Sequence, residues 1–87
     1  MSFCIAVYDV NQKRVGKMLK LFRRYLTWVQ NSVFEGDLTP AQLKQLQLEA
    51  NALLKDNDGV VFYQLRDERY VERIALGRDE ANRSRFL

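Results

Sequence analysis

The sequence predicts a small α+β fold in which two helices cover one face of an antiparallel sheet. Three observations support this prediction. The chain has 87 residues, which suffices for one domain with one hydrophobic core. Segments typical of strands and helices follow one another in the order βαββαβ. The first of them, residues 3–8, is apolar throughout, and such a run indicates a strand covered on both faces.

The first predicted helix covers residues 11–25 and is amphipathic. Apolar residues recur at the spacing of one helix face, and cationic residues recur at the same spacing on the opposite face. The apolar stripe comprises Val15, Met18, Leu19, Phe22 and Leu26. The cationic face comprises Lys13, Lys17, Lys20 and Arg24, with Arg14 and Arg23 at its edges.

Two short strands and a second helix follow. We expect strands at 26–30 and 32–35, where β-forming residues predominate, with a bend at Asn31 and an end at 36–37. The second helix starts with a capping box, which comprises Thr39 as N-cap, Pro40 at the first helical position and Gln42. Its expected buried stripe comprises Leu43, Leu46, Ala50, Leu53 and Leu54, with Leu48 on the outer side.

The rest of the chain contains the last predicted strands. Residues 56–59 turn the chain into a strand at 60–65, and 66–72 form a charged connection. Residues 73–76 are expected to add a short edge strand. The final segment, 78–87, is polar and is expected to be a flexible tail.

This order is the ferredoxin-like βαββαβ plan with an extra C-terminal edge strand, in a single domain of residues 1–77. The helices of so small a domain can cover only one face of the sheet, whereas the first strand indicates that both faces are covered. The sheet of a second copy is the simplest cover. We therefore expect a homodimer packed through its sheets.

Composition restricts the possible chemistry. The chain has one cysteine, Cys4, and no histidine. An intrachain disulfide, the usual zinc sites and nucleophile systems based on histidine are therefore excluded. A hydrolase with this composition would depend on carboxylates and a hard metal ion. No apolar run approaches the roughly 18 residues that span a bilayer, and no signal peptide is evident, so we expect a cytoplasmic protein without a membrane partner.

Charge is distributed unevenly along the chain. Residues 1–34 carry a net charge of +5 and residues 35–87 a net charge of −2. A basic first half suits a polyanion, DNA or RNA, on one face, and the alternative is an ordinary solvated helix surface. The aromatic signature of RNA-recognition sheets is missing, and nothing resembles base readout.

Asp9 and Tyr8 are the candidate catalytic residues, and Asp9 is the candidate metal ligand. Asp9 follows the first strand directly, and with Asp9 of a second copy it would offer two carboxylates to one Mg²⁺ ion. The alternative is that Asp9 is the helix N-cap, with Gln12 completing a capping box. Tyr8 could stack on a base or orient a phosphate, or it could be a core residue. Ser32 could give a hydroxyl to the same region or form a hydrogen bond in a turn.

Two stretches resemble the Cas2 family of small CRISPR-associated proteins, the partner of the CRISPR integrase. One is the pair Tyr8-Asp9 at the end of the first strand, and the other is the motif Gln30-x-Ser32-Val33-Phe34-Glu35. Their separation also fits, and residues 63–66 and 73–77 agree with the usual ending of the family. The resemblance covers nearly all of residues 3–77.

The resemblance implies a ferredoxin-like homodimer whose last strand pairs with the sheet of the other subunit. It implies that Asp9 is the metal-binding aspartate and faces its twin across the dimer axis, with Mg²⁺ or another hard divalent cation as cofactor. It implies a metal-dependent endonuclease acting on RNA or DNA, and a subunit of CRISPR spacer acquisition that binds nucleic acid and bridges integrase dimers. Two alternatives stay open, a purely architectural DNA-holding adaptor and a stand-alone toxin-like ribonuclease of the same fold.

One position departs from the family pattern. Many members carry an arginine two residues before the motif glutamine, where this chain has Trp28. The cationic contact of those relatives is therefore not carried over. Trp28 is expected to pack in the dimer or to stack on a nucleotide.

Overall fold

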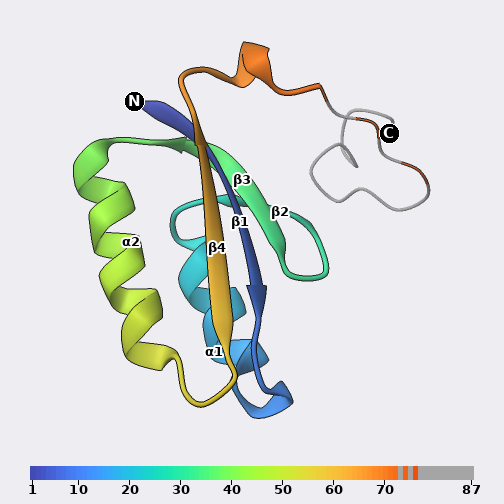
Figure 1. The fold of residues 1–87 in the computed structure, drawn as a ribbon, viewed down its shortest axis with the longest axis vertical. Coiled ribbons are helices and arrows are strands. Elements are labelled where there is room, and N and C mark those ends of the chain that lie inside the picture. Colours follow the sequence, from blue (N-terminus) through green and yellow to red (C-terminus); the bar gives the residue numbers. More distant parts are fainter. Residues whose placement is uncertain (73, 75, 77–87) are drawn as a thin grey trace.

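A four-stranded antiparallel sheet with two helices on one face forms the fold, in a computed structural model that describes residues 1–72, 74 and 76 (Figure 1). The strands lie in the order β2-β3-β1-β4. The predicted βαββαβ plan is confirmed. In chain order the elements are β1 Ser2–Asp9, α1 Gln12–Arg23, β2 Thr27–Gln30, β3 Val33–Leu38, α2 Pro40–Leu53, β4 Gly59–Leu65 and the 3₁₀-helix η1 Glu68–Tyr70.

The central strand β1 has two distinct faces. Cys4, Ala6 and Tyr8 are buried toward the helices, whereas Ile5 and Val7 alternate with them and lie on the opposite, open face. β1 pairs antiparallel with β3 on one side and with β4 on the other. The helices therefore cover only one face of the sheet, as predicted.

Aromatic rings fill the core between sheet and helices. The ring centroid of Phe22 from α1 lies 5.3 Å from that of Tyr8 and 5.4 Å from that of Phe34. The Phe22 and Phe62 centroids are 6.0 Å apart. One helix ring thus bridges three strands, a tilted and stacked packing that aromatic rings favour.

The apolar stripe predicted for α1 is wrong in part. Met18, Phe22 and the following Leu26 are buried, but Val15 is exposed and Leu21 is buried instead. The predicted stripe is that of a helix that packs only against a sheet. In the structure α1 also packs against α2, so its buried arc turns toward that helix and includes Leu21.

The predicted start of α2 is confirmed in detail. The Thr39 hydroxyl accepts a hydrogen bond from the Gln42 backbone N–H at 3.1 Å, and the Gln42 side chain accepts one from the Thr39 N–H at 2.9 Å. The stripe also holds, because Leu43, Leu46 and Ala50 are buried, Leu53 and Leu54 are half-buried, and Leu48 is exposed.

β3 is longer than predicted, because Gly36 and Asp37 belong to the strand instead of ending it. Gly36 pairs with Cys4 and has φ +156°, and a Cβ atom there would lie 3.2 Å from Cδ2 of Leu26. Glycine is used here for close approach to a core leucine, not for a turn.

The end of the chain differs from the prediction where the structure describes it. The charged connection 66–72 contains η1. In the segment expected to form an edge strand, Ile74 and Leu76 are exposed and belong to no strand, and residues 73 and 75 lie outside the described residues. The predicted tail, 78–87, also lies outside them. None of the helices in the described part of the chain is long and apolar enough to cross a membrane.

Candidate nucleic-acid and metal interface

Asp9 is the last residue of β1 and is exposed. Its backbone is held by pairing with Gly59 of β4. Its carboxylate forms no hydrogen bond or ion pair with any residue that the structure describes. Because side chains alternate along a strand, Asp9 lies on the same open face as Ile5 and Val7.

The alternative role of Asp9 as helix cap is contradicted. The N-cap of α1 is Asn11, whose Oδ1 accepts a hydrogen bond from the Lys13 backbone N–H at 2.9 Å. Gln12 is the first residue of the helix and makes no capping box with Asp9. The Asp9 carboxylate is therefore not engaged in local structure and is available for a ligand.

A second acid lies at the same end of the sheet but is fully engaged. Asp58 accepts hydrogen bonds from the Arg14 Nε at 2.6 Å, from the Asn11 N–H at 2.9 Å and from the Lys55 N–H at 3.0 Å. The hydrogen bond from Arg14 is the largest cause that holds the pKa of Asp58 far below its usual range, and the two backbone donors add to it. Asp58 therefore stays ionised and bonded.

Asp9 fits a hard divalent cation that keeps most of its water. Mg²⁺ prefers oxygen ligands, retains several waters and is commonly held by one or two carboxylates together with phosphate oxygens. The described residues contain no group of three or more potential metal-ligating side chains. The unpartnered carboxylate of Asp9 is compatible with one such ligand.

Tyr8 is a core residue in this structure. Its side chain is 3% exposed, and its ring packs against Phe22 and Phe34. Its hydroxyl is buried without a hydrogen-bond partner among the described residues. Burial raises the pKa of Tyr8, and the nearby Ser32 side chain lowers it in part. The Ser32 hydroxyl is nevertheless not placed to form a hydrogen bond with the Tyr8 hydroxyl. Of the roles left open for Tyr8, the structure supports the core one.

The six cations of the predicted nucleic-acid face have different environments. Lys13, Lys17 and Lys20 are exposed, and their side chains have no partner among the described residues. The remaining three are engaged with other side chains: Arg14 with Asp58, Arg23 with the ring of Trp28 and Arg24 with Glu49.

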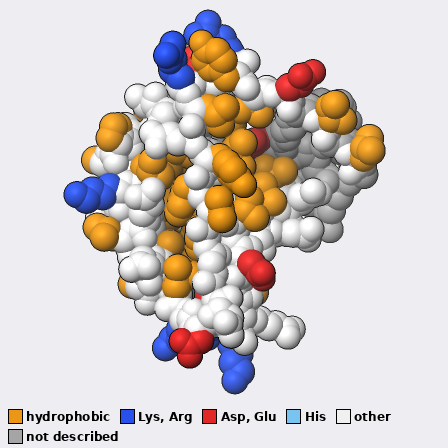
Figure 2. All heavy atoms as spheres, in the orientation of Figure 1, with side chains coloured by type: hydrophobic (Ala, Val, Ile, Leu, Met, Phe, Trp, Pro, Cys, Tyr) orange, Lys and Arg blue, Asp and Glu red, His pale blue; other side chains and the backbone are white. Residues whose placement is uncertain are grey.

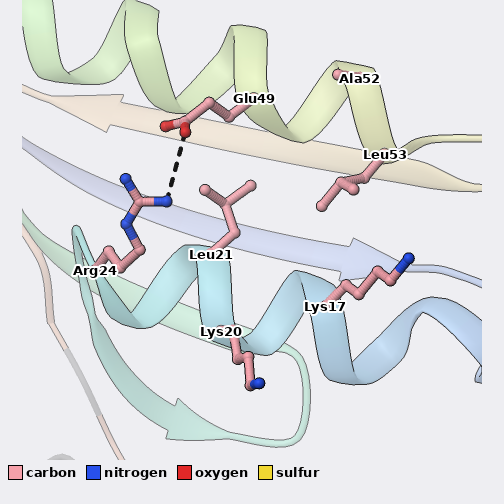
Figure 3. A pocket seen from close by; sticks show the side chains of 7 residues that line it. All are labelled: Lys17, Lys20, Leu21, Arg24, Glu49, Ala52 and Leu53. Atoms are coloured by element: carbon pink, nitrogen blue, oxygen red, sulfur yellow. Dashed lines mark hydrogen bonds and ion pairs between the residues drawn. The ribbon is translucent and has the colours of Figure 1, made fainter.

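A shallow groove of about 530 Å³ runs between α1 and α2 (Figure 3). Leu21 and Leu53 extend into it from the two helices, and Arg24 reaches across it to Glu49, with Nη1 and Oε1 3.5 Å apart. Lys17 and Lys20 line its α1 side and extend away from Glu49 (Figure 3). The lysine charge is thus not neutralised by the acid of the groove.

Trp28 packs within its own chain. It is half-buried against the core, and its Nε1 donates a hydrogen bond to the Asn31 carbonyl oxygen at 2.8 Å. The guanidinium carbon of Arg23 lies 5.0 Å from the ring centroid, within the range of a cation–π contact. Both ends of the tryptophan are therefore satisfied without a nucleotide.

Sequence reasoning missed Asp58, Asn11 and Glu49. Asp58 was assigned only to a turn, and its partner Arg14 is 44 residues away, so no local pattern reports the pair. Glu49 pairs with a residue 25 positions away and also accepts a hydrogen bond from the Tyr25 hydroxyl. The one local signal was for Asn11, a preferred N-cap residue type two positions before Lys13.

Comparisons with known proteins agree on one family. The family model described as CRISPR associated protein Cas2 matches residues 1–73. The chain is 42% identical over 86 residues to the CRISPR-associated endoribonuclease Cas2 of Dictyoglomus turgidum, covering 98% of this chain and 99% of that one. It is 46% identical over 76 residues to the protein of the same name from Thermotoga maritima, covering 86% and 87%. A crystal structure of Cas2 superposes with a TM-score of 0.85 at 40% identity, covering 92% and 91%.

Proposed function

The chain belongs to the CRISPR-associated protein Cas2 family, and we propose that it is a homodimeric subunit of CRISPR spacer acquisition that binds nucleic acid and bridges integrase dimers. The integrase partnership rests on family membership and on the resemblance of the two motifs. Nucleic-acid binding rests on one observation, the row of unpartnered lysines on α1.

The lysine row fits a phosphate backbone. Lys13, Lys17 and Lys20 are spaced four and three residues apart, so they lie along one side of α1. Exposed cations without acidic partners gain most from neutralising phosphates, because they need not break an ion pair first. Such contacts are independent of base sequence, so we expect binding with little sequence preference and a strong dependence on salt.

The open face of the sheet supports the homodimer. Val61 is 50% exposed and Tyr63 56% exposed, and in the register of β4 they lie beside Val7 and Ile5. Figure 2 shows hydrophobic side chains gathered in the middle of the face toward the viewer, where β1 and β4 lie in front of α1 in Figure 1. A contiguous apolar patch of this kind is typical of a protein interface, and a second copy offers a matching one.

A second candidate function is metal-dependent cleavage of RNA or DNA, favoured by the free carboxylate of Asp9. Relatives at 35–46% identity carry the name endoribonuclease. Asp9 lies on the open face, so sheet-to-sheet packing brings this face of one subunit toward that of the other. Two Asp9 carboxylates would then hold one hydrated Mg²⁺. When bound, the ion would polarise a phosphate and lower the pKa of its water.

In this proposal, different residues of the chain bind the metal ion and the nucleic acid. The Asp9 carboxylate binds the ion, and the lysines of α1 hold the backbone of the nucleic acid. The chain contains no histidine, and the carboxylate of Asp58 at this end of the sheet is bonded to Arg14. Proton transfer is therefore assigned to metal-bound water and solvent.

Reversing the charge of the lysine row tests the nucleic-acid proposal. The triple variant Lys13→Glu, Lys17→Glu, Lys20→Glu should bind duplex DNA more weakly. Its plot of log K against log salt concentration should be flatter by up to about 2.7, since each lost phosphate contact removes about 0.9 from the slope. Fluorescence anisotropy over a range of salt concentrations measures both quantities.

A control separates this effect from net charge. Lys44 on α2 and Lys55 after it are also exposed but lie outside the row. The double variant Lys44→Glu, Lys55→Glu should keep nearly the wild-type slope. An unchanged slope in the triple variant would show that α1 does not hold the nucleic acid.

A further inference from the structure

We propose that Asp58 is a positioning residue for Asp9. Its carboxylate holds the connection between β1 and α1, and so fixes the place and direction from which Asp9 meets a ligand. The inference rests on the proposed metal site at Asp9 and names a residue through which that site is built. Asp58 itself is not a ligand in this proposal.

Three segments of the chain converge on the Asp58 carboxylate. The Asn11 N–H belongs to the connection between β1 and α1, Arg14 belongs to the first turn of α1, and the Lys55 N–H belongs to the connection between α2 and β4. Each donor lies within 3.0 Å of a carboxylate oxygen. Asp58 thus joins the start of α1 to the turn that leads into β4.

Asp9 lies between two points that this turn holds. On one side its backbone pairs with Gly59, the residue directly after Asp58. On the other side the chain is held at Asn11, two residues further on, by the bond to Asp58. Asp9 therefore has a backbone fixed from both directions and a side chain that is free among the described residues. This combination favours ligand binding by the carboxylate, because the backbone that carries it loses little conformational entropy when the ligand binds.

The ion pair also decides which charges remain available. The Asp58 side chain is 2% exposed and that of Arg14 19% exposed, and each covers the other. Asp58 is thereby removed as a competing ligand for a cation. Arg14 is removed from the cationic face, although sequence places it there. The Asp9 carboxylate, in contrast, has no partner among the described residues.

An amide at position 58 could not replace the carboxylate. Arg14 and Lys55 both donate to Oδ2, and Asn11 donates to Oδ1, so both oxygens act as acceptors. In Asp58→Asn one of them becomes an NH₂ group that faces a donor. The variant keeps the size of the side chain but loses at least one of the three hydrogen bonds.

Binding of Mn²⁺ alone, followed through the electron paramagnetic resonance signal of the free ion, tests the proposal without relying on cleavage. Each variant is first confirmed as folded by circular dichroism and compared with the wild type in oligomeric state. Asp58→Asn should weaken Mn²⁺ binding about 10–100-fold, the usual effect of removing a residue that orients a metal ligand. The matched control is Asp56→Asn, an exposed acid in the same turn, which should bind Mn²⁺ as the wild type does.

A double variant separates positioning from a general structural effect. Asp9→Asn should lose Mn²⁺ binding, and adding Asp58→Asn in that background should change nothing further, since the second residue acts through the first. If Asp58→Asn does not fold, Arg14→Gln takes its place, because it removes one of the three donors and leaves the two backbone bonds. It too should weaken Mn²⁺ binding.

The outcomes separate this inference from the function on which it rests. Wild-type Mn²⁺ affinity in folded Asp58→Asn, or in Arg14→Gln where the first variant fails to fold, overturns the positioning role and leaves the metal site intact. Wild-type Mn²⁺ affinity in Asp9→Asn overturns the metal site itself and the positioning role with it.

Discussion

Replacing Tyr8 by phenylalanine removes one oxygen atom from the core and nothing else. In the structure that hydroxyl is buried and has no hydrogen-bond partner among the described residues. The ring keeps its contacts with Phe22 and Phe34 in the variant. Tyr8→Phe therefore isolates the free-energy cost of burying an unsatisfied hydroxyl.

The expected effect is stabilisation. An unsatisfied buried polar group costs about 1–3 kcal/mol. We therefore expect the free energy of unfolding to rise by about 1 kcal/mol, the lower end of this range. For a domain of this size, such a change raises Tm by about 4–8 °C.

Thermal and urea denaturation of wild type and Tyr8→Phe measure this difference. Both proteins are used at equal concentration, because the Tm of the proposed dimer depends on it. Phe22→Leu, a truncation of the neighbouring ring, should destabilise the protein and serves as the opposite control. A Tyr8→Phe variant that is less stable than wild type would refute the reasoning, since it would mean that the hydroxyl has a partner in the working protein.

Two further predictions concern the proposed dimer and the stability of the protein at low pH. Val61→Glu, on the open face, should shift the protein toward monomer in sedimentation velocity. The control Leu48→Glu, on the outer side of α2, should not. An intact dimer of the Val61→Glu variant would contradict packing through the sheets. Because Arg14 lowers the pKa of Asp58 below its usual 3.8, the ion pair stabilises the fold above that pH and the contribution is lost as pH falls below it. The difference in unfolding free energy between wild type and Asp58→Asn should accordingly shrink below about pH 3.8 in urea titrations, and a difference that stays constant down to the lowest accessible pH would contradict this.

Local signals in the sequence were sufficient for much of the fold. The capping box of Thr39 and Gln42 is complete within four residues, so both the start of α2 and its bonds could be predicted. The end of β3 could not. Gly36 resembles a strand end when only its neighbours are considered, but its role is set by contact with Leu26, ten residues earlier.

The cap of α1 shows how two local signals compete. Asp9 and Asn11 are both good N-cap residues, and each is followed by a residue compatible with a helix start. Pairing of Asp9 with Gly59 extends β1 to that position, which leaves Asn11 as the cap. That pairing joins residues far apart in the chain, so periodicity near Asp9 could not have decided between them.

The cations of the predicted nucleic-acid face differ in their environments, which the sequence did not indicate. Helical spacing placed six cations together, and the structure leaves the three lysines without partners among the described residues. Arg14 and Arg24 are paired with Asp58 and Glu49, from the connection after α2 and from α2 itself. Which cations remain free depends on tertiary contacts, which spacing along one helix does not report.

Mg²⁺-dependent cleavage of single-stranded RNA and duplex DNA by wild type and Asp9→Asn is the most direct test of the proposed site. Asp9 is exposed and has no partner among the described residues, so the substitution should change stability by no more than about 0.5 kcal/mol. The two proteins are first compared in folding and in oligomeric state. We predict that wild type cleaves at least one substrate when Mg²⁺ is present and that Asp9→Asn does not. Equal cleavage by both proteins would contradict a catalytic metal site at Asp9. No cleavage by either would contradict the nuclease function and would leave the protein as a nucleic-acid-holding adaptor without catalysis.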